Sequence, residues 1–525
     1  MNARLMHRHR DFAAGRDLQG HERLLLQDLE LNTLFRTMAN GDEFLFDVAR
    51  TVLLSGLEND VDTVLYRQAV LKDSLKHPTV VRTLYDLAME AIDAKRKHWL
   101  GVFSRYPSAI LHGSIELLQL FLGVLRKLRV VAEQQTGRFE SEGFSAFFAM
   151  LQTELSDDYL AEIEEHLRNL KFPEGVLMSA ELGRGNQGTN YILRKPHRRR
   201  QTWLARLLGK GPPAYTFRIA DRDEAGHRAL SELRDRGIDP AANALAQSSD
   251  HILGFFQTLR AELAFYLGCL NLHDRLTAKG EPLCFPKPAP AGTRRYRVSG
   301  LYDVCLALHM ERRVVGNTVD ADGKSLVIIT GANQGGKSSF LRGIGLAQVM
   351  MQAGMFVPAE SFDAELCTGL FSHYKREEDA TMKKGKLDEE LARLSEIVDR
   401  LAPNSMLLLN ESFAATNERE GSEIAKQVVH ALLEQGVKIF YVTHLYEFAH
   451  GFFERKTQDT LFLRAERRAD GTRTFRLVEG EPEETTYGED LYRKIFGDEP
   501  DATPAVGVFA GDRHPAGSPL GRRDG

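Results

Sequence analysis

The fold is decided by the stretch Gly331-Ala332-Asn333-Gln334-Gly335-Gly336-Lys337-Ser338, which fits the pattern Gly-x4-Gly-Lys-Ser/Thr. Residues 325–330 before it have the composition of a buried strand, and residues 339–353 after it have the apolar spacing of a helix. Glycines at such a strand-to-helix turn let backbone N–H groups approach phosphate oxygens, and the helix dipole adds positive potential. We therefore predict a phosphate-binding loop. The alternative, a Gly-rich turn with a chance Lys-Ser, does not account for the strand and helix around it.

In a loop of this type the lysine reaches the β- and γ-phosphates and the following hydroxyl ligates Mg²⁺. Lys337 and Ser338 take these places, so ATP and Mg²⁺ are the predicted ligands. The residues predicted to hold the nucleotide in this loop are Gly331, Asn333, Gly335, Gly336, Lys337, Ser338 and Ser339.

Length and composition set the broad class. The chain has 525 residues, which predicts more than one domain. Its net charge is -5, so any contact with nucleic acid must come from local patches. The four cysteines include no Cys-x-x-Cys pair and indicate small buried residues in a reducing compartment. We find no apolar run of bilayer length and no signal peptide, so we expect a cytoplasmic protein that contacts no membrane.

Periodicity divides the chain. Residues 22–170 and 252–276 have helical spacing, and residues 114–134 are apolar nearly all round, as in a helix packed inside a bundle. Residues 282–292 are Pro-rich and indicate a linker, after which strands and helices alternate as in an α/β layer fold. We predict a flexible N-terminus at 1–21, a mainly α-helical domain at 22–290, an α/β domain at 291–496 and a disordered tail at 497–525.

Residues 194–210 form a basic insertion in the helical domain, with seven Lys or Arg and no acid. Arg194, Lys195 and the run from Arg198 to Arg200 would neutralise phosphates of DNA or RNA. The helical spacing of Trp203, Leu204, Leu207 and Leu208 also fits a helix on a membrane surface. A solvated loop with one docked apolar turn explains the same residues, so all three interpretations stay open.

Two further strands carry the chemistry. Residues 405–411 form an apolar run that ends at Asn410 and Glu411. In related loops the first acid holds a Mg²⁺-bound water and the next glutamate orients the attacking water. Asn410 keeps an oxygen but loses the charge, which predicts weaker Mg²⁺ binding, and Glu411 is the predicted general base. A third strand, residues 437–443, ends at His444, which is either a γ-phosphate sensor or only a packed residue.

These residues together resemble the MutS family of ABC-type ATPases. The stretch from Thr330 to Ser338 resembles its Thr-Gly-Pro-Asn-Met-Gly-Gly-Lys-Ser loop. Residues 409–417, Leu-Asn-Glu-Ser-Phe-Ala-Ala-Thr-Asn, line up with its Asp-Glu-Ile-Gly-Arg-Gly-Thr-Ser stretch. Thr443-His444 matches its Thr-His, and residues 60–68 resemble the start of its helical core more weakly.

The resemblance implies an α/β P-loop ATPase domain of ABC type, preceded by a mainly α-helical core and lever domain. It also implies a head-to-tail homodimer in which residues of one subunit complete the ATP site of the other. Thr416 and Asn417 fall in such a segment. The family's Ser-Thr-Phe signature loop aligns with Gly385, Lys386 and Leu387, so Lys386 is predicted to replace a hydroxyl contact with a charge.

The departures from the family shape the predicted function. No mismatch-reading domain fits before residue 22, so we expect an ATPase that hydrolyses ATP slowly and clamps structured or branched DNA rather than mismatches. The alternative is an ATP-switched scaffold that binds a protein partner and no DNA. A third interpretation, which follows from Asn410, is a degenerate protein that binds ATP without turnover.

Overall fold

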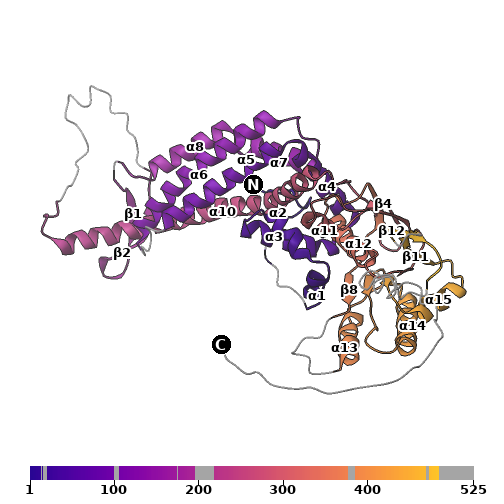
Figure 1. Ribbon diagram of the computed structural model, residues 1–525. Helices are drawn as coiled ribbons and strands as arrows, with labels where there is room; N and C mark the ends of the chain where they lie inside the picture. The colour runs from indigo at the N-terminus through magenta and orange to yellow at the C-terminus, as the bar shows by residue number, and fades with distance from the viewer. Residues whose placement is uncertain are drawn as a thin grey trace, which may run out of the picture.

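The computed structural model of the chain describes residues 1–13, 15, 20–99, 106–173, 175–195, 218–376, 385–468 and 472–483. These residues form an elongated helical part, on the left of Figure 1, and an α/β part on its right. The mixed helical and α/β architecture confirms the coarse fold class predicted from the sequence. The predicted tail, residues 497–525, lies outside the described residues.

The helical part contains α1 (Gly20–Asp28), α2 (Leu31–Ala39), α3 (Glu43–Ser55), the 3-10 turn η1 (Gly56–Glu58), α4 (Val61–Lys76), α5 (Pro78–Trp99), α6 (Pro107–Gln135), α7 (Glu142–Glu154), α8 (Asp157–Asn169) and α10 (Glu224–Ala278). Asp or Ser side chains cap many of these helices, as Asp60 does for α4 and Ser141 for α7. Helix α10 has 55 residues and therefore spans about 80 Å at the usual rise per residue. The helical spacing of residues 22–170 and 252–276 is confirmed.

Helix α6 corrects one expectation. Among the described residues it is long and apolar enough to cross a membrane by length and composition, although the sequence was expected to contain no such run. That test is weak support for a membrane span, because a buried core helix also passes it. Half of the most apolar window of α6 is buried, and the helix contacts α5, α7, α8 and α10. This packing agrees with the predicted place inside a bundle.

A small hairpin follows α8. Strands β1 (Met178–Leu182) and β2 (Gly188–Leu193) pair antiparallel around the turn η2 (Arg184–Asn186), and β2 contacts α10. The basic insertion begins at the end of this hairpin. Arg194 and Lys195 are described, whereas residues 196–217 lie outside the described residues, so the structure does not test the three interpretations of the basic run.

The α/β part contains a six-stranded sheet in the order β12 (Arg473–Glu479), β11 (Thr460–Arg467), β6 (Leu326–Thr330), β10 (Lys438–Val442), β9 (Met406–Asn410) and β8 (Leu370–Tyr374). Neighbours pair in parallel except β12, which is antiparallel to β11. Its helices include α12 (Lys337–Gln352), α13 (Lys386–Val398), α14 (Glu418–Glu434) and α15 (Tyr446–Glu454). Because β6, β10 and β9 are parallel neighbours, their carboxyl ends meet at one edge of the sheet.

A second sheet corrects the predicted linker. Its order is β3 (Lys287–Ala289), β7 (Ser361–Glu365), β4 (Tyr296–Leu301) and β5 (Asn317–Asp320), with α11 (Val304–His309) between β4 and β5. Strand β3 lies inside the segment that was predicted to be a linker, so the α/β part begins before residue 291. Pro288 is tolerated there because β3 is an edge strand, where a missing N–H costs no sheet hydrogen bond.

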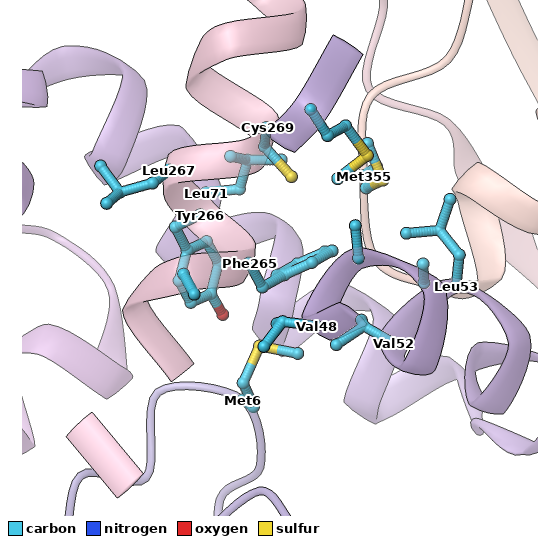
Figure 2. Close-up of a cluster of buried hydrophobic side chains, with 14 of the residues drawn as sticks. Met6, Val48, Val52, Leu53, Leu71, Phe265, Tyr266, Leu267, Cys269 and Met355 are labelled. Atoms are coloured by element: carbon cyan, nitrogen blue, oxygen red, sulfur yellow. The ribbon is translucent and has the colours of Figure 1, made fainter. Parts of the chain in front are cut away.

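The N-terminus is also packed rather than flexible. The carboxylate of Glu262 in α10 accepts backbone N–H bonds from Leu5 at 2.5 Å and Phe12 at 2.7 Å. Met6 is buried, and Figure 2 shows its side chain in an apolar cluster with Val48 of α3 and residues of α10. The prediction of a flexible segment is therefore wrong for residues 1–12, whose backbone satisfies a buried carboxylate.

Candidate nucleotide-binding site

The predicted phosphate loop joins β6 to α12 and is closed by its own lysine. The Nζ atom of Lys337 donates to the carbonyl oxygens of Gly331, at 2.7 Å, and Ala332, at 2.9 Å. The side chain is buried, and burial lowers the pKa of Lys337 to about 8, although the charge of Glu411 opposes the shift. The charged ammonium group of Lys337 thus lies inside the loop, where a bound phosphate would accept hydrogen bonds from it.

The glycines of the loop are required by its geometry. Gly331 and Gly336 have φ angles of 107° and 91°, which residues with a side chain rarely adopt. A Cβ on Gly331 would lie 2.8 Å from the backbone N of Ala465, and one on Gly335 would lie 2.7 Å from its Cβ. No side chain caps α12 at Gly336, so the loop N–H groups at this helix start fit an anion. Asn333 is exposed at the loop tip, and Ser339 is half-buried in the first turn.

The structure brings together the two predicted metal ligands. Asn410 is the last residue of β9, and its Oδ1 accepts a hydrogen bond of 3.0 Å from the hydroxyl of Ser338. Both atoms are oxygens, which Mg²⁺ prefers, and Mg²⁺ commonly takes its other ligands from phosphate and water. The described residues contain no cluster of three or more His, Cys, Asp or Glu side chains for a metal. Ser338 and Asn410 therefore fit a Mg²⁺ ion whose remaining ligands come from a bound nucleotide and water.

Glu411 and His444 also lie together, as the parallel strands predict. Glu411 follows β9, and its Oε1 lies 3.1 Å from Nε2 of His444, two residues after β10. The hydrogen bond from His444 holds the pKa of Glu411 below its usual value, and Lys375 and Lys337 add to the effect. Glu411 is consequently ionised near neutral pH, which is the form that can accept a proton.

The residues predicted to act on the partner's nucleotide lie at helix starts. Lys386 is exposed at the beginning of α13, and Lys383 and Lys384 before it lie outside the described residues. Asn417 caps α14 by accepting the N–H of Glu420, whose carboxylate accepts the hydroxyl of Thr416. In one chain Thr416 and Asn417 thus order α14, and their contact with a second subunit stays a prediction.

Three residues beside the loop were missed by sequence reasoning. Arg473 of β12 donates to the side chain of Gln334 at 2.7 Å. Phe475, two residues on, lines a cavity of about 270 Å³ together with Gly336 and Ser339. The side-chain oxygen of Asn317 accepts the N–H of Leu477 at 2.7 Å and so fixes β12 over the loop. No motif in the sequence points to Arg473 or Phe475, and only a partial likeness of residues 314–317 to the start of a MutS-family ATPase domain marks Asn317.

The fold and this site define a two-part protein, in which a long helical part is joined to an α/β part with a Gly-rich phosphate loop. Comparison with family descriptions assigns both parts. Residues 59–279 match the MutS2 N-terminal domain, and residues 327–496 match MutS domain V. The chain belongs to the MutS family.

Individual relatives agree with this assignment at modest identity. MutS protein homolog 4 of Mus musculus is 28% identical over 203 residues, which is 36% of this chain and 20% of that protein. Endonuclease MutS2 of Thermus thermophilus is 30% identical over 181 residues, 34% of this chain and 23% of that protein. DNA mismatch repair protein MutS of Chlorobium chlorochromatii is 34% identical over 238 residues, 42% and 26% respectively. The matched region thus spans about a fifth to a quarter of each relative.

Proposed function

We propose that this protein binds Mg-ATP in the loop between β6 and α12 and hydrolyses it slowly. The observation that carries the proposal is the meeting of two side-chain pairs beside the loop. Ser338 contacts Asn410, and Glu411 contacts His444. A turn with only a structural role would need neither pair at the carboxyl edge of the sheet. Nucleotide hydrolysis needs both, one pair to hold Mg²⁺ and the other to orient the attacking water.

Each residue then has a distinct role. Lys337 would exchange its two carbonyl partners for phosphate oxygens, and a pKa of about 8 keeps it protonated at neutral pH. Ser338 and Asn410 would hold Mg²⁺, which neutralises charge on the phosphates when it is bound. Glu411 would accept a proton from the attacking water, and His444 holds its carboxylate in place. Because Asn410 carries no charge, we expect weak Mg²⁺ binding and low turnover.

The proposed assembly is a homodimer that contacts DNA. One of the relatives is named a DNA mismatch repair protein and another is named an endonuclease. These names support a DNA-related function for the chain. We propose that Lys386, Thr416 and Asn417 complete the partner's ATP site. ATP binding would close the dimer on structured or branched DNA, and hydrolysis would open it through the helical part.

Nucleotide binding and turnover test the proposal directly. Lys337→Ala should abolish binding of a fluorescent ATP analogue, because the cation in the cradle is removed. Glu411→Gln should keep binding but lower turnover by about a hundredfold or more, because the amide cannot accept the proton. Lys287→Ala, on the exposed side of β3, is the matched control and should change neither. Wild-type turnover in Glu411→Gln would refute Glu411 as the base.

A further inference from the structure

The turn that follows Glu411 has an unusual backbone. Glu411 and Phe413 have positive φ angles of 54° and 66°. Large side chains rarely occupy this region, and such residues persist only where the surroundings hold them. The turn carries the proposed general base, so the groups that hold it bear on the position of that base.

Three buried side chains from three elements hold this turn. The carboxylate of Glu390 in α13 accepts the N–H of Phe413 at 2.7 Å. The hydroxyl of Tyr441 in β10 donates to the carbonyl of Ser412 at 2.6 Å. The Nδ1 atom of His373 in β8 lies 2.7 Å from the hydroxyl oxygen of Ser412. Every residue between Glu411 and Ala414 is therefore hydrogen-bonded to a neighbouring element.

His373 ties the same turn to the backbone of α13. Its Nε2 lies 3.1 Å from the carbonyl oxygen of Glu390, which can only accept, so Nε2 carries the proton. Burial lowers the pKa of His373 to about 4, so the ring is neutral and Nδ1 is an acceptor. The hydroxyl of Ser412 lies within reach of both Nδ1 and the His373 carbonyl, at 2.7 and 2.9 Å. The side chain of Glu390 thus contacts the turn directly, and its main-chain carbonyl contacts the turn indirectly, through the ring of His373.

Glu390 also connects the turn with the start of α13. It lies four residues after Lys386, so the two residues share one side of the helix. We propose that Glu390 is a positioning residue for Glu411, through which a displacement of α13 changes the orientation of the general base. This inference rests on the proposed function, and it adds a route by which contact at the start of α13 regulates hydrolysis.

The expected signature is a loss of turnover without a loss of binding. Without the Glu390 acceptor, the N–H of Phe413 is left unpaired and the strained turn relaxes. Glu411 then shifts relative to His444, and a displacement of about 1 Å lowers the rate by about a hundredfold. The phosphate loop lies on β6 and α12 and does not share these hydrogen bonds, so ATP affinity should stay within about twofold.

The experiment compares four substitutions in the full chain. Glu390→Leu removes the acceptor, Glu390→Gln keeps an acceptor oxygen, and Glu390→Asp shortens the side chain by one methylene. Glu396→Leu, at an exposed position of the same helix, is the matched control. Fluorescent ATP analogue binding, single-turnover hydrolysis and the thermal midpoint are measured for each. We expect slow hydrolysis in Glu390→Leu and Glu390→Asp, and near-normal rates in Glu390→Gln and the control.

A double substitution separates positioning from general damage. In a Glu411→Gln background, Glu390→Leu should cause no further loss of turnover, because it acts through Glu411. If Glu390→Leu does not fold, the hydrolysis rate of Glu390→Asp tests the inference in its place. A normal hydrolysis rate in the folded variants would overturn the inference and leave the proposed function standing. A wild-type protein that binds ATP without any turnover would overturn both.

Discussion

Asn410 is the residue whose chemistry departs most from a strong Mg²⁺ site. Its amide oxygen accepts from Ser338, so the position is right for the ion while the charge is missing. Asn410→Asp should lower the Mg²⁺ concentration for half-maximal ATP turnover by about tenfold, equivalent to about 1.4 kcal/mol. A magnesium titration of the steady-state rate measures the change. ATP analogue binding in the presence of EDTA is the control and should not move.

If the Mg²⁺ concentration for half-maximal turnover stays fixed or rises in Asn410→Asp, then Asn410 is not part of the coordination shell of the ion. The new carboxylate also neighbours Glu411, and two like charges raise each other's pKa. We therefore expect the acid limb of the rate profile to move to higher pH in the same variant.

The residues of the candidate site were largely predictable because each follows a strand. Asn410, Glu411 and His444 stand after apolar runs, and parallel pairing brings the ends of those runs to the loop. The structure places Ser338 within hydrogen-bond distance of Asn410, and the roles of both residues as metal ligands stay predictions. Phe413 shows what could not be predicted. Glycine stands at its place in the aligned family stretch, and its positive φ depends on partners such as Glu390, far away in the sequence.

Elements with long apolar periods were predicted better than short segments that pair at a distance. Residues 252–276 of helix α10 and strand β6 follow from their own residues, whereas the part of α10 that begins at Glu224 was not predicted. Strand β3 does not follow from its own residues, because it pairs with β7, which follows more than seventy residues later. Residues 1–12 have no long apolar period, and their packing depends on Glu262 and Tyr66, whose hydroxyl donates to the carbonyl of Arg4.

The C-terminal end of the phosphate-loop helix α12 is joined to the helical part. Arg67 of α4 is 1% exposed and donates to the carbonyls of Met6, at 3.0 Å, and Ala353, at 3.3 Å. The amide of Asn59 donates to the carbonyl of Gln352 at 2.8 Å. Figure 2 shows Met355, just beyond α12, near residues of α3 and α10 in one apolar cluster. Helix α12 thus contacts the nucleotide loop at one end and the helical part at the other.

The buried Glu262 at this joint should make stability depend on pH. Burial raises the pKa of Glu262 to about 7, because the desolvation cost exceeds the gain from three backbone N–H bonds. The folded state then binds a proton that the unfolded state releases near its ordinary pKa. The stability from this proton is fully present below pH of about 4.5 and is lost as the pH rises through about 7, a change of roughly 3 kcal/mol.

Glu262→Gln keeps a carbonyl acceptor for the N-terminal segment and cannot titrate. Thermal midpoints measured from pH 5 to 8 should therefore fall more steeply with pH in the wild type than in this variant. Glu154→Gln is a control, because its carboxylate is 49% exposed, beside the N-terminal amine. Parallel curves for the wild type and Glu262→Gln would show that Glu262 stays ionised throughout, held by its N–H partners.

In the proposed homodimer, two subunits with different substitutions should complement each other. Lys386→Ala should reduce hydrolysis and spare ATP binding, and Lys337→Ala should bind no ATP. If Lys386 acts on the partner's nucleotide, an equal mixture contains dimers with one complete site. The mixture should then recover about a quarter of the wild-type rate, because half of the dimers are mixed and each has one working site of two. A mixture no more active than its components would argue for a contact within one subunit.

The basic run at residues 194–210 would bind DNA through its phosphates. Binding through phosphate neutralisation releases counterions, so affinity falls steeply with salt and does not depend on base identity. A mismatched and a perfect duplex should consequently bind equally well, and a branched DNA should bind better because it offers two backbones to a dimer. Replacing Arg198, Arg199 and Arg200 together by Ala should lower the salt slope by at most about three, near one for each phosphate that the variant no longer neutralises.

Electrophoretic shift titrations across a salt series measure that slope, and Lys287→Ala, which removes one exposed positive charge on β3, is the control. A clear preference for a single mismatch would contradict phosphate-driven binding, because it requires a base-reading contact. An unchanged slope in the triple variant would move the DNA contact to another surface. Binding of DNA no tighter than that of an acidic polymer would leave the ATP-switched protein scaffold as the better account, since the polymer matches the charge of DNA and lacks the shape that a dimer would grip.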